Sequence, residues 1–216
     1  MENFTQILNI IYLLSGPMLV VIAYIALGQI KVAKLQLEEQ RKVAQIQSKR
    51  DALKLMSEQV SAFNNVTLQL GNDLDDKIER ENITFFDQAK VKVSEKGISI
   101  NIRDFGSLEE LDPIIPELTK FANSLDSLSI YFLSGVADED QAFRAIGSNY
   151  CDSVKDILPF LVMANDYDEH CYSNCLQLFM IWHNRLEVTN MLKQRQELES
   201  QIKDRSIVTI KPVGTA

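Results

Sequence analysis

The chain has 216 residues, of which 46% are hydrophobic and 24% are charged, as is typical of a globular protein. Its formal net charge is −8, and the acids are concentrated in residues 61–170, which hold 21 Asp and Glu against nine Lys and Arg. A surface that binds nucleic acid needs the opposite charge, so we expect no nucleic-acid binding from this segment. Three cysteines are too few, and odd in number, for a disulfide-rich secreted domain, and they indicate reduced thiols.

The N-terminal segment is apolar enough to cross a membrane. Residues 3–30 carry no charged side chain, and a helix over 7–30 extends about 36 Å, longer than a hydrocarbon core of about 30 Å. A signal peptide would begin with basic residues and end at a small-residue cleavage site, and neither feature is present. A buried core helix is the other alternative. We expect a membrane anchor over residues 1–30, with the lipid-facing side chains Ile7, Ile11, Leu14, Pro17, Val20, Ala23, Leu27 and Ile30.

Ser15-Gly16-Pro17 interrupts the apolar run, because proline lacks the amide donor that an unbroken helix needs. Ser15 is suited to cap a helix that begins at Pro17. Residues 3–14 then form either a kinked continuation of the span, which we favour, or a separate helix at the interface.

Flanking charge predicts the orientation of the span. No Lys or Arg precedes it, whereas several follow it closely, and positive residues stay on the cytoplasmic side. We therefore expect a single-pass protein of the inner (plasma) membrane, with its N-terminus outside and the rest of the chain in the cytoplasm. The residues that set this orientation are Lys31, Lys34, Arg41 and Lys42.

Residues 31–70 contain no Gly or Pro and predict a long juxtamembrane helix. Its apolar residues follow a heptad repeat that charged side chains break near the membrane. One interpretation is a coiled-coil stalk through which copies of the chain self-associate. The other, which we favour, is a helix whose first half is solvated and whose second half packs on its own domain. The packing seam consists of Ile46, Leu53, Met56, Val60 and Phe63.

Residues 71–216 predict an acidic helical bundle with a small β component. Gly71-Asn-Asp is expected to end the long helix. The alternating pattern of 91–102 predicts a β-hairpin that has to pack on helices, and 207–212 predicts a short strand. We expect helices at 116–134, from Asp138-Glu-Asp140 through Tyr150, at 154–163 around Pro159, and at 169–205. The fold class is thus mainly α.

No cofactor, metal or catalytic signature stands out. His170, Cys171, Cys175 and His183 are zinc-ligand types, but on one straight helix they do not converge on a tetrahedral site. A nucleophile pair of Cys151 with a histidine is formally possible. We therefore expect neither a cofactor nor a metal.

Residues 125–150 combine an apolar helix, a turn at Gly135-Val-Ala-Asp138 and a second amphipathic helix. In this layout, together with one N-terminal span and a juxtamembrane helix, the chain resembles a prokaryotic and phage-associated family of membrane-anchored proteins that contain a domain of unknown function. The resemblance covers about residues 10–165 and carries over no catalytic residues. It implies a bacterial or phage setting.

These patterns predict a membrane-anchored, non-enzymatic protein whose partners are the bilayer and either another protein or a second copy of itself. A specific form is an effector or partner subunit of a phage-defence system. The alternatives are a membrane-tethered enzyme of unknown reaction and a coiled-coil membrane scaffold.

Overall fold

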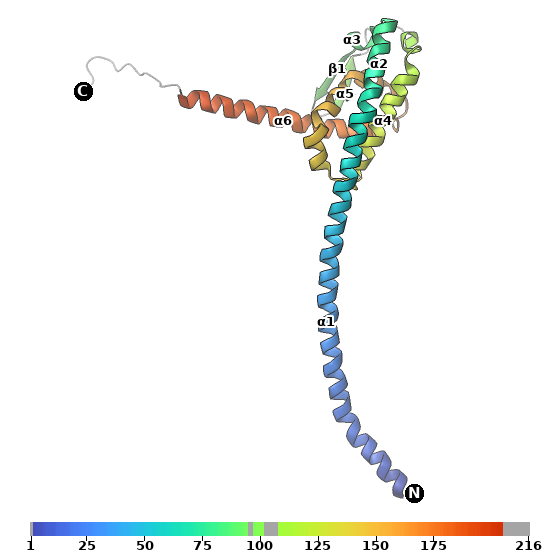
Figure 1. Cartoon of the computed structure of the whole chain (residues 1–216), viewed down its shortest axis with the longest axis vertical. Coiled ribbons are helices and arrows are strands. Elements are labelled where there is room, and N and C mark those ends of the chain that lie inside the picture. The colour runs from blue at the N-terminus through green and yellow to red at the C-terminus, as the bar shows by residue number, and fades with distance from the viewer. Residues whose placement is uncertain (1, 95–96, 102–107, 205–216) are drawn as a thin grey trace, which may run out of the picture. The chain divides into compact units, whose positions relative to one another are not determined.

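The computed structural model describes residues 2–94, 97–101 and 108–204, and it is mainly helical with one small antiparallel sheet (Figure 1). Two compact units make up the chain, Met1–Asp51 and Ala52–Ala216. The predicted mainly α fold with a hairpin is confirmed, and the predicted strand at 207–212 lies outside the described residues. The elements are α1 (Glu2–Ala62), the π-helical turn η1 (Phe63–Thr67), α2 (Leu68–Glu81), α3 (Phe85–Gln88), β1 (Lys90–Ser94), β2 (Gly97–Asn101), the 3-10 turn η3 (Leu108–Leu111), α4 (Ile115–Leu133), α5 (Glu139–Tyr167) and α6 (Ser173–Asp204).

α1 is one helix from Glu2 to Ala62, and it includes Pro17. The prediction that a new helix begins at Pro17 under a Ser15 cap is therefore wrong. The Ser15 hydroxyl instead donates to the carbonyl oxygen of Tyr12 at 2.7 Å, a bond to the preceding turn of the same helix. The carbonyl that loses its donor at Pro17 is that of Leu13, one turn earlier, and Leu13 is exposed.

The helix also continues past Gly71, where the sequence predicted its end. Gly71 lies against the ring of Phe121 from α4, and a Cβ at this position would stand 3.2 Å from two ring atoms. The glycine therefore serves a close approach of α2 and α4. The helix ends instead at Asn82, whose φ of 53° places it in the left-handed region that Asn tolerates better than most residues.

η1 sits where the helix enters the core of the second unit. A π-helical turn accommodates one extra residue and so rotates the face that the following helix presents. Phe63 and Thr67 are both buried there, and the Thr67 hydroxyl lies 2.7 Å from that of Ser124 on α4. The extra residue thus aligns α2 with α4.

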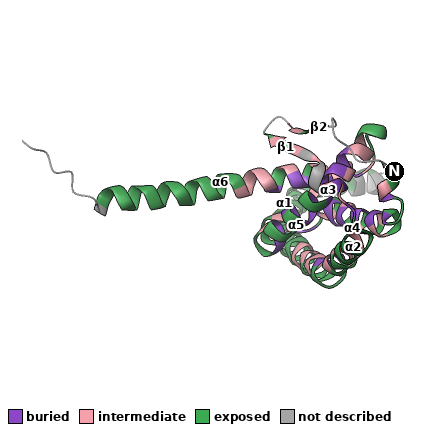
Figure 2. Ribbon diagram, turned by 90° about the horizontal axis from the view of Figure 1, so that it is seen from above, coloured by how far each residue is buried: buried purple, intermediate pink, exposed green. Residues whose placement is uncertain are grey.

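The core of the second unit lies where α4, α5 and the first half of α6 meet (Figure 2). α4 begins with a proline in its first turn, as predicted. α5 begins within the predicted Asp138-Glu-Asp140 segment, and the Asp138 carboxylate caps it by accepting from the amide of Gln141 at 3.1 Å. α5 then runs through Pro159, and the carbonyl that loses its donor belongs to Lys155, which is exposed to water.

The predicted hairpin is confirmed as β1 and β2, which pair antiparallel with Val91 opposite Ile100 and Val93 opposite Ile98. Val91, Val93 and Ile98 are half-buried and pack against the hydrophobic core of the unit. Two strands alone are marginally stable in water, so this packing is what stabilises the hairpin.

Candidate functional site

The first half of α1 displays an unbroken apolar surface. Between Tyr12 and Ile30 every side chain is exposed, and the apolar window within α1 is not buried by any other part of the described chain. The core helix of a soluble protein would be covered, and this window is not. By length and composition α1 is therefore able to span a membrane. Ile7 and Ile11 lie on the same helix with side chains outside the described residues, and the other expected anchor residues, Leu14, Pro17, Val20, Ala23, Leu27 and Ile30, are exposed.

The charged residues that follow the apolar segment are also exposed. Lys31 and Lys34 lie within one turn of its end, and Arg41 and Lys42 lie on the same helix. Exposed basic side chains at this position are suited to contact anionic lipid headgroups.

The expected packing seam is divided between two environments. Ile46 is exposed, whereas Leu53, Met56 and Val60 are half-buried and Phe63 is fully buried. Met56 and Val60 pack against the hydrophobic core of the second unit. This end of the seam is therefore covered by the chain itself.

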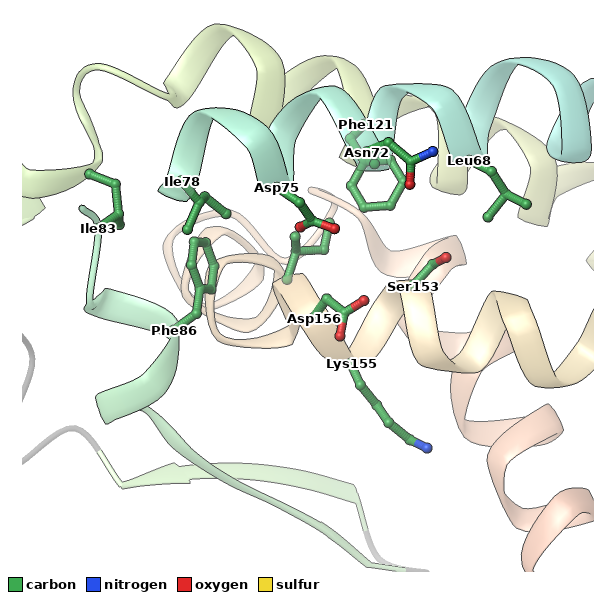
Figure 3. A pocket seen from close by; sticks show the side chains of 12 residues that line it. Leu68, Asn72, Asp75, Ile78, Ile83, Phe86, Phe121, Ser153, Lys155 and Asp156 are labelled. Carbon is green, nitrogen blue, oxygen red and sulfur yellow. The ribbon is translucent and has the colours of Figure 1, made fainter. Parts of the chain in front are cut away.

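A groove of about 510 Å³ lies on the second unit and is lined by α2, α5 and the segment around Phe86. The carboxylates of Asp75 from α2 and Asp156 from α5 face the same hollow (Figure 3). The ring of Phe86 supplies an apolar wall, while Lys155 points away and pairs with Asp152 at 3.1 Å. Sequence reasoning missed this pair, because the two acids come from helices far apart in the chain.

The environment of the groove disfavours the charged form of both carboxylates, Asp75 and Asp156. Partial burial raises the pKa of Asp75, and the charges of Glu79 and Asp76 raise it further. Burial likewise raises the pKa of Asp156, with a second contribution from the charge of Asp75. Such a pair can hold protons or accept a cationic side chain. Within the described ranges, no group of three or more His, Cys, Asp or Glu is placed to hold a metal ion.

The cysteines sit in environments that suppress their reactivity. Burial raises the pKa of Cys151 and that of Cys175 to about 12, so both remain protonated thiols near neutral pH. The Tyr150 hydroxyl donates to the carbonyl oxygen of Cys175 at 3.2 Å and lies 2.7 Å from the Ser129 hydroxyl. The Tyr150 hydroxyl also lies 3.5 Å from the Cys175 sulfur, so Cys175 belongs to a buried network that joins α4, α5 and α6.

The two histidines lie in different surroundings, His170 in the turn before α6 and His183 within α6. α6 begins at Ser173, later than predicted, so His170 and Cys171 lie in the preceding turn rather than in the helix. The ring of His183 stacks on that of Phe179 with a centroid distance of 5.3 Å. His183 thus packs on an aromatic neighbour in α6.

A polar cluster that the sequence did not reveal ties the start of α5 to α6. Trp182 Nε1 donates to Glu139 Oε1 at 2.5 Å, and the Arg185 guanidinium donates to the same carboxylate at 3.1 and 3.4 Å. The guanidinium also lies 4.6 Å above the ring centroid of Phe143. A buried tryptophan requires an acceptor for its N–H, and this requirement was the available signal.

A second link joins α4 to the start of α6. The Asp126 carboxylate accepts from the amide of Cys175 at 2.9 Å and from the side chain of Asn174 at 3.3 Å. An acid at a helix N-terminus satisfies otherwise unpaired amides and opposes the helix dipole. Both links hold α6 in place through its first half.

No protein-family model matches this chain, and neither a curated protein nor a solved structure shows significant similarity to it. The resemblance to a phage-associated membrane family therefore stays a prediction.

Proposed function

We propose that this protein is a single-pass, membrane-anchored helical module that presents an acidic, non-catalytic interaction surface to the cytoplasm. One observation carries the proposal. From Tyr12 to Ile30, α1 bears a charge-free surface that the described chain leaves uncovered. A surface of this size is costly in water and is stabilised by lipid.

The orientation follows from the exposed basic residues. Lys31 and Lys34 directly follow the apolar segment, and residues 1–30 contain no Lys or Arg. Because positive charge is retained on the cytoplasmic side, these residues favour a cytoplasmic second unit. Its excess of acids opposes adsorption on an anionic bilayer, which keeps its surface available to a protein partner.

The surroundings of the cysteine thiols and of the His183 imidazole support a non-catalytic role. Cys151 and Cys175 are buried and protonated, and His183 is stacked on a phenylalanine ring. A nucleophile needs an exposed thiolate or a base within hydrogen-bond reach, so these residues favour a structural role. The competing enzyme hypothesis requires loss of activity when all three cysteines are replaced by Ser and both histidines by Gln.

Membrane attachment is tested with two matched double variants. Val20→Arg/Ala23→Arg places two charges inside the apolar segment, at a cost of about 2.5–3.5 kcal/mol each. Gln36→Arg/Gln40→Arg adds the same charge at exposed positions beyond it. After carbonate extraction, the wild type and the second variant should remain in the membrane pellet and the first should not. A soluble wild type, or equal behaviour of the two variants, would refute attachment.

Orientation is tested separately by protease protection of a C-terminal tag in sealed vesicles. A tag accessible only from the cytoplasmic side supports the proposal. Reversal of the charge bias, by Lys31→Glu/Lys34→Glu with lysines added before the apolar segment, should expose the tag on the other side. Accessibility from the outside in the wild type would contradict the proposed direction.

A phage-defence role at the bacterial inner membrane is the specific form that the family resemblance predicts. It stays a prediction, and it requires that protection or toxicity vanish when residues 1–30 are removed. The alternative of a scaffold assembled through the α1 seam is disfavoured, because Met56, Val60 and Phe63 are covered by their own chain.

A further inference from the structure

The second half of α6 carries a row of exposed apolar side chains. Val188, Met191, Leu198 and Ile202, here called the α6 stripe, are 55–69% exposed. Together with Arg195 they recur at alternating intervals of three and four residues. This is the spacing of a coiled-coil seam, in which every such residue faces a partner helix.

This part of α6 receives little stabilising packing from the rest of its own chain. Every residue from 187 to 203 is exposed, in contrast to the buried first half of the helix (Figure 2). An isolated helix of this length is marginal in water, and most helical stability comes from packing of an apolar face. The α6 stripe is therefore a surface that is stabilised by an occupant.

The balanced charge of this segment favours a second copy of the chain as the occupant. Residues 187–203 hold three acids and three bases, so two such segments carry no net repulsion, unlike the strongly acidic stretch 61–170. The cation within the seam is already neutralised, since Arg195 Nε donates to Glu199 Oε1 at 2.7 Å. A lipid surface would select a basic polar face, which this segment lacks.

The shape next to the stripe indicates how two copies pair. A hollow of about 350 Å³ between β1 and α6 is lined by Val93 and His183, and also by Val188 and Met191 of the stripe. The opposite end of the stripe ends in Ile202, its most exposed member. Antiparallel pairing inserts each Ile202 at the hollow of the other copy, whereas parallel pairing sets hollow against hollow and fills neither.

We propose that two copies of this chain associate through the α6 stripe in antiparallel orientation, each placing Ile202 against Met191 and the hollow of the other. The seam spans about 21 Å along the helix, so the dimer is expected to dissociate on dilution. The inference does not require membrane anchoring, and its failure leaves the proposed function untouched.

Dimerisation is tested on the full chain in detergent micelles by sedimentation across a concentration series. Leu198→Glu/Ile202→Glu removes apolar contacts at exposed positions, and Gln196→Glu/Ser200→Glu adds the same charge beside the stripe. The wild type and the second variant should form dimers, and the first should be monomeric with unchanged helix content. A monomeric wild type, or a first variant as dimeric as its control, would overturn the proposal.

Orientation is tested by oxidative cross-linking in a Cys171→Ser background, where the two remaining natural thiols are buried. Met191→Cys and Ile202→Cys chains should each fail to cross-link alone, yet cross-link when mixed. Cross-linking of each variant with itself would show parallel pairing and refute the antiparallel arrangement. An absence of cross-links in every combination would refute the α6 pairing altogether.

Discussion

Glu139 is the residue at which the packing of α5 on α6 can be tested most directly. Its carboxylate accepts from Trp182 at 2.5 Å and from Arg185 at 3.1 Å, and it lies in the first turn of α5. Glu139→Gln keeps an oxygen acceptor for the indole but loses the charge. Glu139→Ala removes the acceptor as well and leaves the indole N–H of the fully buried Trp182 without its hydrogen bond to Glu139. We expect the two substitutions to differ in a defined order.

The magnitudes follow from the separate contributions. The half-exposed ion pair with Arg185 contributes about 0.2–1 kcal/mol, and an acid in the first helical turn contributes about 0.3–1 kcal/mol. A hydrogen bond to a charged acceptor contributes about 1.5–3 kcal/mol. Glu139→Gln should therefore lower the free energy of unfolding by about 0.5–2 kcal/mol, and Glu139→Ala by about 2–5 kcal/mol.

The assay is urea unfolding of the full chain in mild detergent, followed by fluorescence. The chain has a single tryptophan, Trp182, so the signal comes from this cluster. Glu197→Gln, at an exposed position on α6, is the matched control and should leave the midpoint unchanged. A cost below about 1 kcal/mol for Glu139→Ala would refute the reasoning. Equal costs for Gln and Ala would show that charge alone, rather than the indole bond, stabilises the contact.

Three further results are expected. Gly147→Ala should destabilise the second unit by about 1–3 kcal/mol in urea unfolding. The new Cβ would stand 2.6 Å from the ring of Phe143, which is held between Trp182 and the Arg185 guanidinium. Unchanged stability would show that the ring moves freely. Cys151 and Cys175, with pKa values of about 12, should resist iodoacetamide at neutral pH until urea unfolds the chain, and rapid native-state labelling by mass spectrometry would contradict their burial. Asp156 binds its proton more tightly in the folded state, because its pKa is raised from 3.8, so its contribution to stability falls as pH rises from that value through the raised pKa. Asp156→Asn should accordingly raise the melting temperature at neutral pH and lose this advantage in acid, and an equal effect at both pH values would exclude titration as the cause.

Features that depend on local pattern were predictable from the sequence. The apolar run before Lys31, the alternation of Val91 and Val93 and the acids at the start of α5 each predicted the element that the structure shows. Such signals arise from neighbours along the chain, so composition and periodicity are sufficient to read them.

Features that depend on tertiary contacts were not predictable. Gly71 reads as a helix end, and only the ring of Phe121 explains why it is helical. The groove acids come from different helices, and the acceptor of Trp182 lies on α5. A single sequence contains no local signal that distinguishes these partners from other residues of the same type, because propensity is a weak guide where packing decides.

The hairpin has a consequence for behaviour in concentrated solution. Within the described residues, β1 and β2 pair only with each other, so each strand has a second backbone edge with no strand partner. The apolar residues of β1 face the core, and the exposed Lys92 stands opposite the exposed Ser99 on the other face. A charged side chain at the middle of an open strand discourages the addition of further strands. We therefore expect Lys92 to disfavour fibril-like growth by strand addition at the edge of β1.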